Sequence, residues 1–441
     1  MAEQRPLGAV HAAALVVASM VGTGVFTITG TLLVPLPSPL VVLAAWAVSG
    51  LLALCGAAVY AELGTMMPRV GGEYVYLSRA FGPAMGFMSG WVALIVGFAT
   101  PTAVGAVGFA SYVHAVNPAL PQVLVAVSLI VAITAVHMID VRFGARVQAG
   151  LAGLVVAVIV LFIGAALATG RLSLANMAAG VGGVRANSGG GVLASAGAFA
   201  IGLVQVSYAY SGWNGAAYIA GEVREPARAL PRALIMGTGL VTVLYLALNL
   251  VYLCAVPPAT LAGQINVGHI AATALFGPRG AQLVSSLIAL TAAGFVSAML
   301  MSGPRVAVAM AEDGVFFRGA FDRTNARGAP TLAVGLQGAL AIIAVLTARF
   351  EQLLVYVGFT LTLNAAAAVL AAFVLRWREP ASERPHRALG WPLSGVLFLV
   401  LAAYMTVLAV RERPRESTAA LATLIVGGLV YAGWHRRRRR T

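Results

Sequence analysis

Long apolar stretches alternate with short polar segments along the chain, and the polar segments are rich in proline, glycine and arginine. A stretch of about 20 apolar residues is long enough to cross a bilayer as an α-helix. The pattern therefore predicts an all-α polytopic membrane protein, with residues 1–441 forming a single membrane domain. We expect twelve transmembrane helices, at residues 10–33, 39–66, 83–114, 121–138, 146–169, 194–220, 231–256, 280–311, 331–348, 352–376, 391–410 and 417–434.

Two of these apolar stretches are interrupted near their middle. The first interruption, in residues 20–26, has one threonine between two glycines, and the second, in residues 208–214, groups polar and aromatic residues around Gly212. Non-helical backbone at bilayer depth is tolerated only where it is buried in protein or lines a wet cavity. A matched pair of interrupted helices is the best sequence indication of a transporter's substrate site.

The interrupted helices are the first and the sixth, five helices apart. This spacing predicts two five-helix repeats of opposite orientation, over residues 10–169 and 194–376, followed by two additional helices in residues 391–434. Because each repeat has an odd number of helices, the second copy is inserted upside down. Both interruptions are then expected near the middle of the membrane.

The composition supports a membrane protein and limits its partners. The chain is 60% hydrophobic and 10% charged, with a mean hydropathy of +0.92, whereas soluble domains carry about 25% charged residues. The net charge of +14 comes from 28 arginines spread between the apolar stretches, so we expect the lipid bilayer and no nucleic acid as a partner. The run Arg436–Arg440 is expected to contact anionic lipid headgroups.

The arginines also predict an orientation. If the N-terminus is inside, 21 of the 28 arginines fall on the cytoplasmic side, which is the side that the positive-inside rule favours. Three arginines between the last two helices, at positions 411, 413 and 415, are the local exception. We therefore expect a multi-pass protein of the plasma membrane, the inner membrane of a bacterium, with both termini cytoplasmic.

The first interruption predicts a site for a carboxylate. Unwinding at Gly22–Gly24 exposes backbone N–H groups at the start of a half-helix, where the helix dipole also favours an anion. Thr23 adds a hydroxyl. Close helix packing through small residues is the alternative explanation for this glycine pair.

The second interruption predicts hydrogen-bond acceptors. The carbonyl groups of Tyr208, Ala209 and Ser211 lose their i+4 partners and are expected to accept bonds from an ammonium group. Tyr208 and Tyr210 are expected to cover the substrate, with Trp213 on the cavity wall; an interfacial aromatic belt is the alternative. Together the two interruptions match a zwitterion.

Acidic residues are expected only at the helix ends. Their absence from mid-membrane depth argues against a cationic substrate and against a carboxylate proton carrier. Glu62 and Glu73 are expected near arginines at the cytoplasmic side. Glu222 is expected to pair with Arg224 or Arg228 in the cytoplasmic gate.

Metal sites and cofactors are not expected. The eighth helix offers Thr291, Ser297 and Ser302, which do not form an adjacent pair of hydroxyls for sodium, and serines inside membrane helices usually bond to their own helix. Cys55 and Cys254 are expected to be small buried apolar residues. His11, His114 and His137 lie near helix ends without a nucleophile, base or metal partner, so we expect no enzymatic activity.

Four segments carry a resemblance to a known family. They are GTGVF (22–26), AELGTMMPRVGGEYVYL (61–77), YSGWNGAAYIAGEVREPARALPRAL (210–234) and SGPRVAVAMAEDGVFFRGAF (302–321). The chain resembles the amino acid–polyamine–organocation superfamily, and within it the L-type amino acid transporter branch. The resemblance covers roughly residues 8–340 and rests on specific motifs.

This resemblance implies a fold similar to the bacterial leucine transporter, working by alternating access. It implies that the substrate α-carboxylate is held by Val21, Gly22, Thr23 and Gly24. It implies that the α-amino group is held by Tyr208, Ala209 and Ser211, with Tyr208 as an aromatic gate. The remaining gate residues are expected to be Trp213, Asn214 and Glu222, and side-chain selectivity is expected from Ser19, Met20, Ala103 and Ser297.

The chain departs from the family pattern at two places. Many sodium-independent members have a lysine on the fifth helix, and here Val155 takes that position in a chain without lysine. Proton symport through that lysine is excluded. The sequence leaves open whether the protein works by exchange, by proton coupling through another group or by sodium coupling. Animal L-type members are joined to a heavy chain by a disulfide, but the loop Ser111–Gln122 has no cysteine, and we expect no such partner.

The sequence thus predicts a secondary permease or exchanger for neutral amino acids. An exchanger of cationic amino acids or amines is the alternative within transport, in which cation–π contact with Tyr208 replaces a carboxylate. A membrane sensor or scaffold that transports nothing is the alternative of another class. The sequence sets no oligomeric state.

Overall fold

The computed structural model describes residues 8–36, 38–139, 141–179, 191–315, 319–321, 323–326 and 328–438. Of residues 141–152, 191–194, 309 and 435–438 it describes the backbone alone. Parts of the 170–192 loop and of the arginine run Arg436–Arg440 lie outside this description. The described residues are helical or in turns, without a β-strand, so the predicted all-α class is confirmed.

Helices account for most of the described chain. Their bounds are α1 (Ala9–Met20), α2 (Gly24–Leu32), α3 (Pro39–Met66), α4 (Glu73–Phe81), α5 (Pro83–Val92), the π-helix η1 (Ala93–Ala99), α6 (Thr100–Val116), α7 (Gln122–Ile139), α8 (Val141–Ala168), α9 (Ala175–Ala178), α10 (Gly191–Tyr210), α11 (Gly215–Tyr218), the 3-10 turn η2 (Ala220–Glu222), α12 (Pro226–Ala255), α13 (Pro258–Leu261), α14 (Val267–Glu312), α15 (Thr331–Thr347), α16 (Phe350–Arg378), α17 (Leu393–Glu412) and α18 (Pro414–Arg438).

The described part of the chain holds nine helical segments long and apolar enough to cross a membrane, counting α1–α2 and α5–η1–α6 as one segment each. Two shorter apolar helices, Gly153–Ala168 and Thr331–Thr347, accompany them. Large apolar side chains lie exposed on the outer helices, such as Leu161 and Leu429. Such a surface suits lipid rather than water, so the protein is a multi-pass membrane protein.

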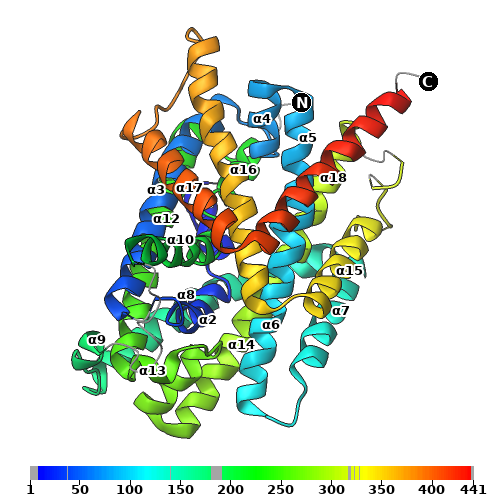
Figure 1. The fold of residues 1–441 in the computed structure, drawn as a ribbon. Helices are drawn as coiled ribbons and strands as arrows, with labels where there is room; N and C mark the ends of the chain where they lie inside the picture. The colour runs from blue at the N-terminus through cyan, green and yellow to red at the C-terminus, as the bar shows by residue number, and fades with distance from the viewer. Residues whose placement is uncertain are drawn as a thin grey trace.

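The helices run between two ends of the molecule (Figure 1). One end gathers α4, the connection between α16 and α17, and the last turns of α18, while the other end holds α9, α13 and the turn between α6 and α7. In the interior, α12 packs against both α1 and α3, and α14 packs against α6 and α8. The interrupted helices are therefore enclosed by other helices.

The eighth predicted helix is longer than expected. The sequence predicts residues 280–311, whereas α14 begins at Val267 and runs for 46 residues. The backbone leaves helical geometry at Gly277 (φ 74°), directly before Pro278, which lacks an N–H group. The helix is thus bent, and a short apolar segment precedes the predicted span.

Candidate functional site

The first helix is interrupted where the sequence predicts. Helix α1 ends at Met20, Val21 leaves helical geometry (ψ 84°), and α2 begins at Gly24. The N–H group of Gly22 donates to the Met20 carbonyl oxygen at 2.9 Å. The Gly22 N–H group is therefore already paired within the protein.

The next three N–H groups are the available donors. Among the described residues, the backbone N–H groups of Thr23, Gly24 and Val25 have no backbone hydrogen-bond partner. They point out of the start of α2, which is the positive end of its dipole. The Thr23 hydroxyl is buried and unpaired within the same part of the chain. The donor group therefore lies one residue further along than predicted.

The second interruption follows α10 and is a four-residue turn. Helix α10 ends at Tyr210, Gly212 adopts φ +99°, and α11 begins at Gly215. Only glycine adopts this φ without strain. The turn is sharp enough to leave α11 as a separate short helix.

The carbonyl groups of this turn are not equally free. The Tyr208 carbonyl accepts from the Ser211 N–H at 2.9 Å, and the Tyr210 carbonyl accepts from the Trp213 N–H at 3.4 Å. The Ser211 carbonyl has no hydrogen-bond partner within the described ranges. Ser211 thus offers the open acceptor, and Tyr208 keeps one lone pair.

The two interruptions are in direct contact. A Cβ at Gly24 would lie 2.8 Å from the Cβ of Ala209, and a Cβ at Gly212 would lie 2.4 Å from the carbonyl oxygen of Ser19. Both distances are shorter than non-bonded contacts of a Cβ allow. The absence of a side chain at Gly24 is what lets the two segments meet.

Tyr245 links the two interruptions and was not predicted. Its buried hydroxyl lies 2.7 Å from the Met20 carbonyl oxygen and 3.1 Å from the Ala209 carbonyl oxygen. Its ring packs edge-on against Trp46 and Tyr210. The Ala209 carbonyl, predicted to be open to substrate, therefore already has a donor.

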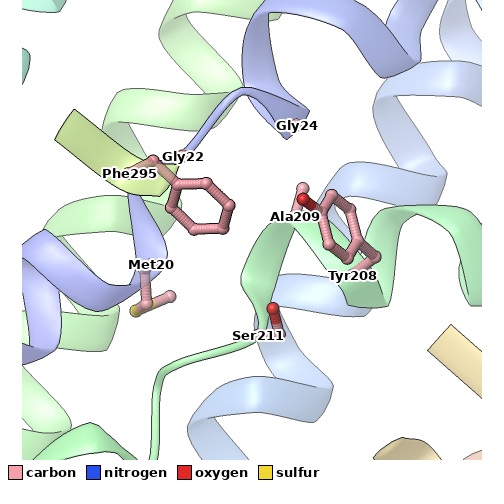
Figure 2. A pocket seen from close by; sticks show the side chains of 7 residues that line it. All are labelled: Met20, Gly22, Gly24, Tyr208, Ala209, Ser211 and Phe295. Carbon is pink, nitrogen blue, oxygen red and sulfur yellow. The ribbon is translucent and has the colours of Figure 1, made fainter. Parts of the chain in front are cut away.

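A narrow pocket lies where the interruptions meet, with almost no free space between its walls. It is lined by Met20, Gly22, Gly24, Tyr208, Ala209, Ser211 and Phe295. Figure 2 shows the rings of Phe295 and Tyr208 on opposite sides of this space. The hydroxyl of Tyr208 is buried and has no hydrogen-bond partner among the described residues.

Phe295 is the lining residue that sequence reasoning missed. Its ring sits in a slot between two glycines: a Cβ at Gly22 would lie 2.7 Å from the ring, and one at Gly105 would lie 2.8 Å from it. Nothing in the sequence separates this phenylalanine from the other apolar residues of α14. Only the packing of α14 against α6 brings it to the pocket.

Several predicted residues lie beside the pocket rather than in its lining. The Ser297 hydroxyl lies 2.9 Å from Nε2 of His137, so it faces α7, and Ala103 is fully buried on α6. The other predicted residues that are not part of the lining are Ser19, Val21 and Thr23. Val155 is buried on α8 among apolar residues.

The predicted gate residues have different surroundings. The Trp213 ring lies edge-on to Tyr60 at 4.6 Å. Glu222 is exposed and, within the described residues, forms no ion pair, because Arg228 instead meets Glu225 at 3.9 Å. The predicted pairing of Glu222 with Arg224 or Arg228 is therefore wrong.

Asn214 bonds to a buried carboxylate, Glu73, at 2.8 Å. Glu73 was expected near arginines, but it forms no salt bridge with any described residue and instead accepts hydrogen bonds from neutral groups. Burial raises the pKa of the Glu73 carboxyl, while these hydrogen bonds oppose the shift. The turn at Gly71 and Gly72, both with positive φ, directs Glu73 inward at the start of α4.

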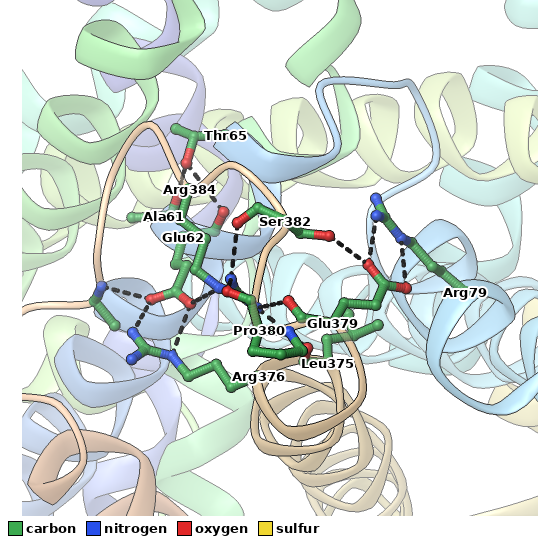
Figure 3. Close-up of polar contacts among 11 residues, drawn as sticks. Ala61, Glu62, Thr65, Arg79, Leu375, Arg376, Glu379, Pro380, Ser382 and Arg384 are labelled. Atoms are coloured by element: carbon green, nitrogen blue, oxygen red, sulfur yellow. Dashed lines mark hydrogen bonds and ion pairs between the residues drawn. The ribbon is translucent and has the colours of Figure 1, made fainter.

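Glu62 does have the expected arginine partners (Figure 3). Arg376 binds both carboxylate oxygens, Arg384 lies 3.4 Å away, and the N–H group of Ala388 donates at 2.8 Å. The Arg376 guanidinium also lies over the Trp391 ring, 4.1 Å from its centroid. This cluster fastens the end of α16 and the following loop to α3.

Comparison with known proteins agrees with this architecture. The family model described as "Amino acid permease" matches residues 7–431. The chain is 28% identical to the mouse b(0,+)-type amino acid transporter 1, covering 97% of this chain and 87% of that protein. It is 28% identical to the mouse large neutral amino acids transporter small subunit 2 (98% and 81%) and 27% identical to the mouse Asc-type amino acid transporter 1 (97% and 80%). The chain therefore belongs to the amino acid permease family and is an amino acid transporter rather than an enzyme.

Proposed function

We propose that the protein moves neutral amino acids across the plasma membrane by alternating access, and that the substrate's charged backbone binds between the two interruptions. The observation that carries this proposal is that the lining of one pocket includes both Gly24, whose backbone N–H is unpaired together with those of its neighbours Thr23 and Val25, and Ser211, whose carbonyl is unpaired. A free amino acid carries both complementary groups on one carbon.

The carboxylate end would bind at the start of α2. Three free N–H groups and the Thr23 hydroxyl supply up to four donors there, and the helix dipole adds a favourable potential. Glycines at positions 22 and 24 keep the backbone uncovered. The proposed carboxylate clamp is the segment Val21–Val25, in which Thr23, Gly24 and Val25 supply the free N–H groups.

The ammonium end would bind at the second interruption. The Ser211 carbonyl is open, and the Tyr208 carbonyl has a lone pair left. The third predicted carbonyl, that of Ala209, would contribute by holding Tyr245 in place. The Tyr208 ring, facing Phe295 across the pocket, is the proposed aromatic gate.

The pocket lining favours a neutral side chain. None of its seven residues carries a charge at neutral pH, so a cationic side chain would be desolvated without a counter-charge. One relative is named for large neutral amino acids, which is consistent with this substrate class. An exchanger of cationic amino acids would need a carboxylate that the lining lacks.

We propose the twelve-helix arrangement of two inverted repeats for the whole chain, with repeats at residues 10–169 and 194–376 and two additional helices at residues 391–434. The contact between the two interruptions supports it, because inverted repeats bring equivalent segments together near the membrane middle. The distribution of arginines supports cytoplasmic termini.

We also propose that the protein works without a disulfide-linked partner. Cys55 and Cys254 are both free and buried, so neither presents a thiol to another chain. The coupling mechanism is proposed as exchange or facilitation, because Val155 supplies no charge at the position of the family lysine.

Purified protein in liposomes tests the substrate class. We expect uptake of labelled neutral amino acids to rise when the liposomes contain an unlabelled neutral amino acid, and to be inhibited by neutral but not by cationic amino acids. Selective uptake of arginine, or uptake that needs no internal substrate and follows an imposed proton gradient, would contradict the neutral exchanger.

A further inference from the structure

Four elements meet at the Glu73 carboxylate. The contacts come from α3, from the second interruption, from α11 and from α16, so residues far apart in sequence converge on one side chain. The donors are the Tyr60 hydroxyl at 2.7 Å, the Asn214 amide at 2.8 Å, the Tyr218 hydroxyl at 2.6 Å and the Asn364 amide at 2.8 Å. We call this group of five residues the Glu73 junction.

The junction distinguishes the two protonation states of Glu73. An ionised carboxylate only accepts hydrogen bonds, and all four neighbours donate. When Oε2 is protonated, the Tyr218 hydroxyl must turn to accept, and the Asn364 NH₂ group faces an oxygen with less capacity to accept. The protonated junction therefore keeps its bonds with Tyr60, Asn214 and Tyr218 and weakens the one with Asn364.

No cation compensates the ionised form within the described residues. The arginines of the packed elements have other partners: Arg79 binds Glu379, Arg376 binds Glu62, and Arg378 binds the Ala80 carbonyl. The titratable groups that face Glu73 from α3, α4 and α11 are Tyr60, Tyr76 and Tyr218. Helix α5, packed beside α4, has no titratable side chain.

Burial without a counter-charge penalises the ionised carboxylate. Glu73 is 4% exposed, and burial raises its pKa more than the four hydrogen bonds lower it. In a conformation that admits water to the junction, the pKa returns towards its ordinary value. Between those two values, the closed junction holds a proton that the opened junction releases.

We propose that Glu73 is a proton-binding site of the transport cycle, which takes up a proton when the Glu73 junction closes and releases it when the junction opens. This inference rests on the proposed function, because it requires the second interruption, joined through Asn214, to move during transport. Acidification then stabilises the closed junction, and this stabilisation disappears as the pH rises through the value at which the closed form titrates.

Infrared spectroscopy of the full chain in liposomes tests the site without any transport measurement. A protonated carboxyl group has its own C=O stretching band. We expect such a band to titrate above the pH range of an exposed glutamate and to be absent from Glu73→Gln. The matched control is Glu379→Gln, which removes an ion-paired carboxylate at the end of α16 and should leave the band unchanged.

A second variant keeps the test decisive if Glu73→Gln folds poorly. Tyr218→Phe removes one hydrogen bond to the ionised form, so the midpoint of the band should rise by about one pH unit. In exchange assays, the wild-type rate should depend on pH across this midpoint, whereas Glu73→Gln should show a flat profile. A wild-type band or pH profile that survives in Glu73→Gln would overturn the inference, whereas absence of neutral amino acid transport with the band intact would overturn the proposed function alone.

Discussion

The hydroxyl of Tyr245 lies 2.7 Å from the carbonyl oxygen of Met20, the last residue of α1 before its interruption. The same hydroxyl lies 3.1 Å from the Ala209 carbonyl oxygen in the second interrupted helix. Carbonyl groups at a helix end lack intrahelical partners. The single hydroxyl proton of Tyr245 is therefore shared between carbonyl groups at the ends of both interrupted helices.

Tyr245→Phe should disrupt this link while keeping the ring in place. Loss of the hydroxyl leaves the Ala209 carbonyl unpaired, while the Met20 carbonyl keeps the Gly22 N–H; the cost is about 1–3 kcal/mol in stability, and the pocket loosens. We expect a lower melting temperature in detergent and a rate of exchange reduced about tenfold. Tyr252→Phe, two turns further along α12, is the control, because its buried hydroxyl has no partner among the described residues; an equal effect of both changes would contradict the bridging role.

Gly24→Leu should abolish transport. Even a Cβ at this position lies 2.8 Å from the Cβ of Ala209, so a leucine forces the two interruptions apart and covers the free N–H groups. Radiolabelled exchange in liposomes measures the loss. Gly239→Leu adds the same side chain where nothing lies within 4 Å of the added Cβ and should transport normally. Normal transport by the Gly24 variant would refute the proposed carboxylate clamp.

Phe295→Ala should shift selectivity towards larger side chains. The ring fills the slot between Gly22 and Gly105 and borders the pocket, so its removal enlarges the space for a substrate. The cavity also costs about 3–5 kcal/mol in stability. Competition by tryptophan relative to alanine should increase in this variant and decrease in Gly105→Ala, which pushes the ring towards the pocket. Unchanged competition ratios in both variants would exclude Phe295 from the site.

Glu62→Gln should destabilise the protein without altering selectivity. The change leaves Arg376 and Arg384 without a buried counter-charge, which costs about 3–5 kcal/mol. Glu379→Gln removes a partly exposed pair with Arg79 and should cost less than about 1 kcal/mol. Thermal unfolding in detergent compares the two. A larger loss for the Glu379 variant would show that the Glu62 cluster does not hold α16 to α3.

The sequence reveals the two interruptions because their signal is local. Gly22, Gly24 and Gly212 stand inside apolar stretches that would otherwise continue as helices, and the structure interrupts the helices at these positions. Three predicted residues of the second interruption, Tyr208, Ala209 and Ser211, also line the pocket, as does Met20 at the end of α1. For these residues, the pattern of glycine and polar positions within the apolar stretches was sufficient to predict the site.

The other contacts depend on packing between distant helices. Tyr245 and Phe295 look like ordinary core residues until α12 and α14 are placed against the interruptions. Ser297 has the polarity expected of a site residue but bonds to His137 on α7. Glu73 lies in a segment that suggests a surface turn, and only its four donors from elsewhere in the chain show that it is buried.

Helix α16 is attached to its surroundings at two carboxylates, through Arg376 to Glu62 and through Asn364 to Glu73. Asn364 and Arg376 are about three turns apart along α16. Tyr60 of α3 bonds to the same Glu73 carboxylate, and Glu62 itself belongs to α3. Helices α3 and α16 are thus held together at two points. The substrate would be carried by motion of the interrupted helices relative to this pair, and α3 and α16 would not move apart.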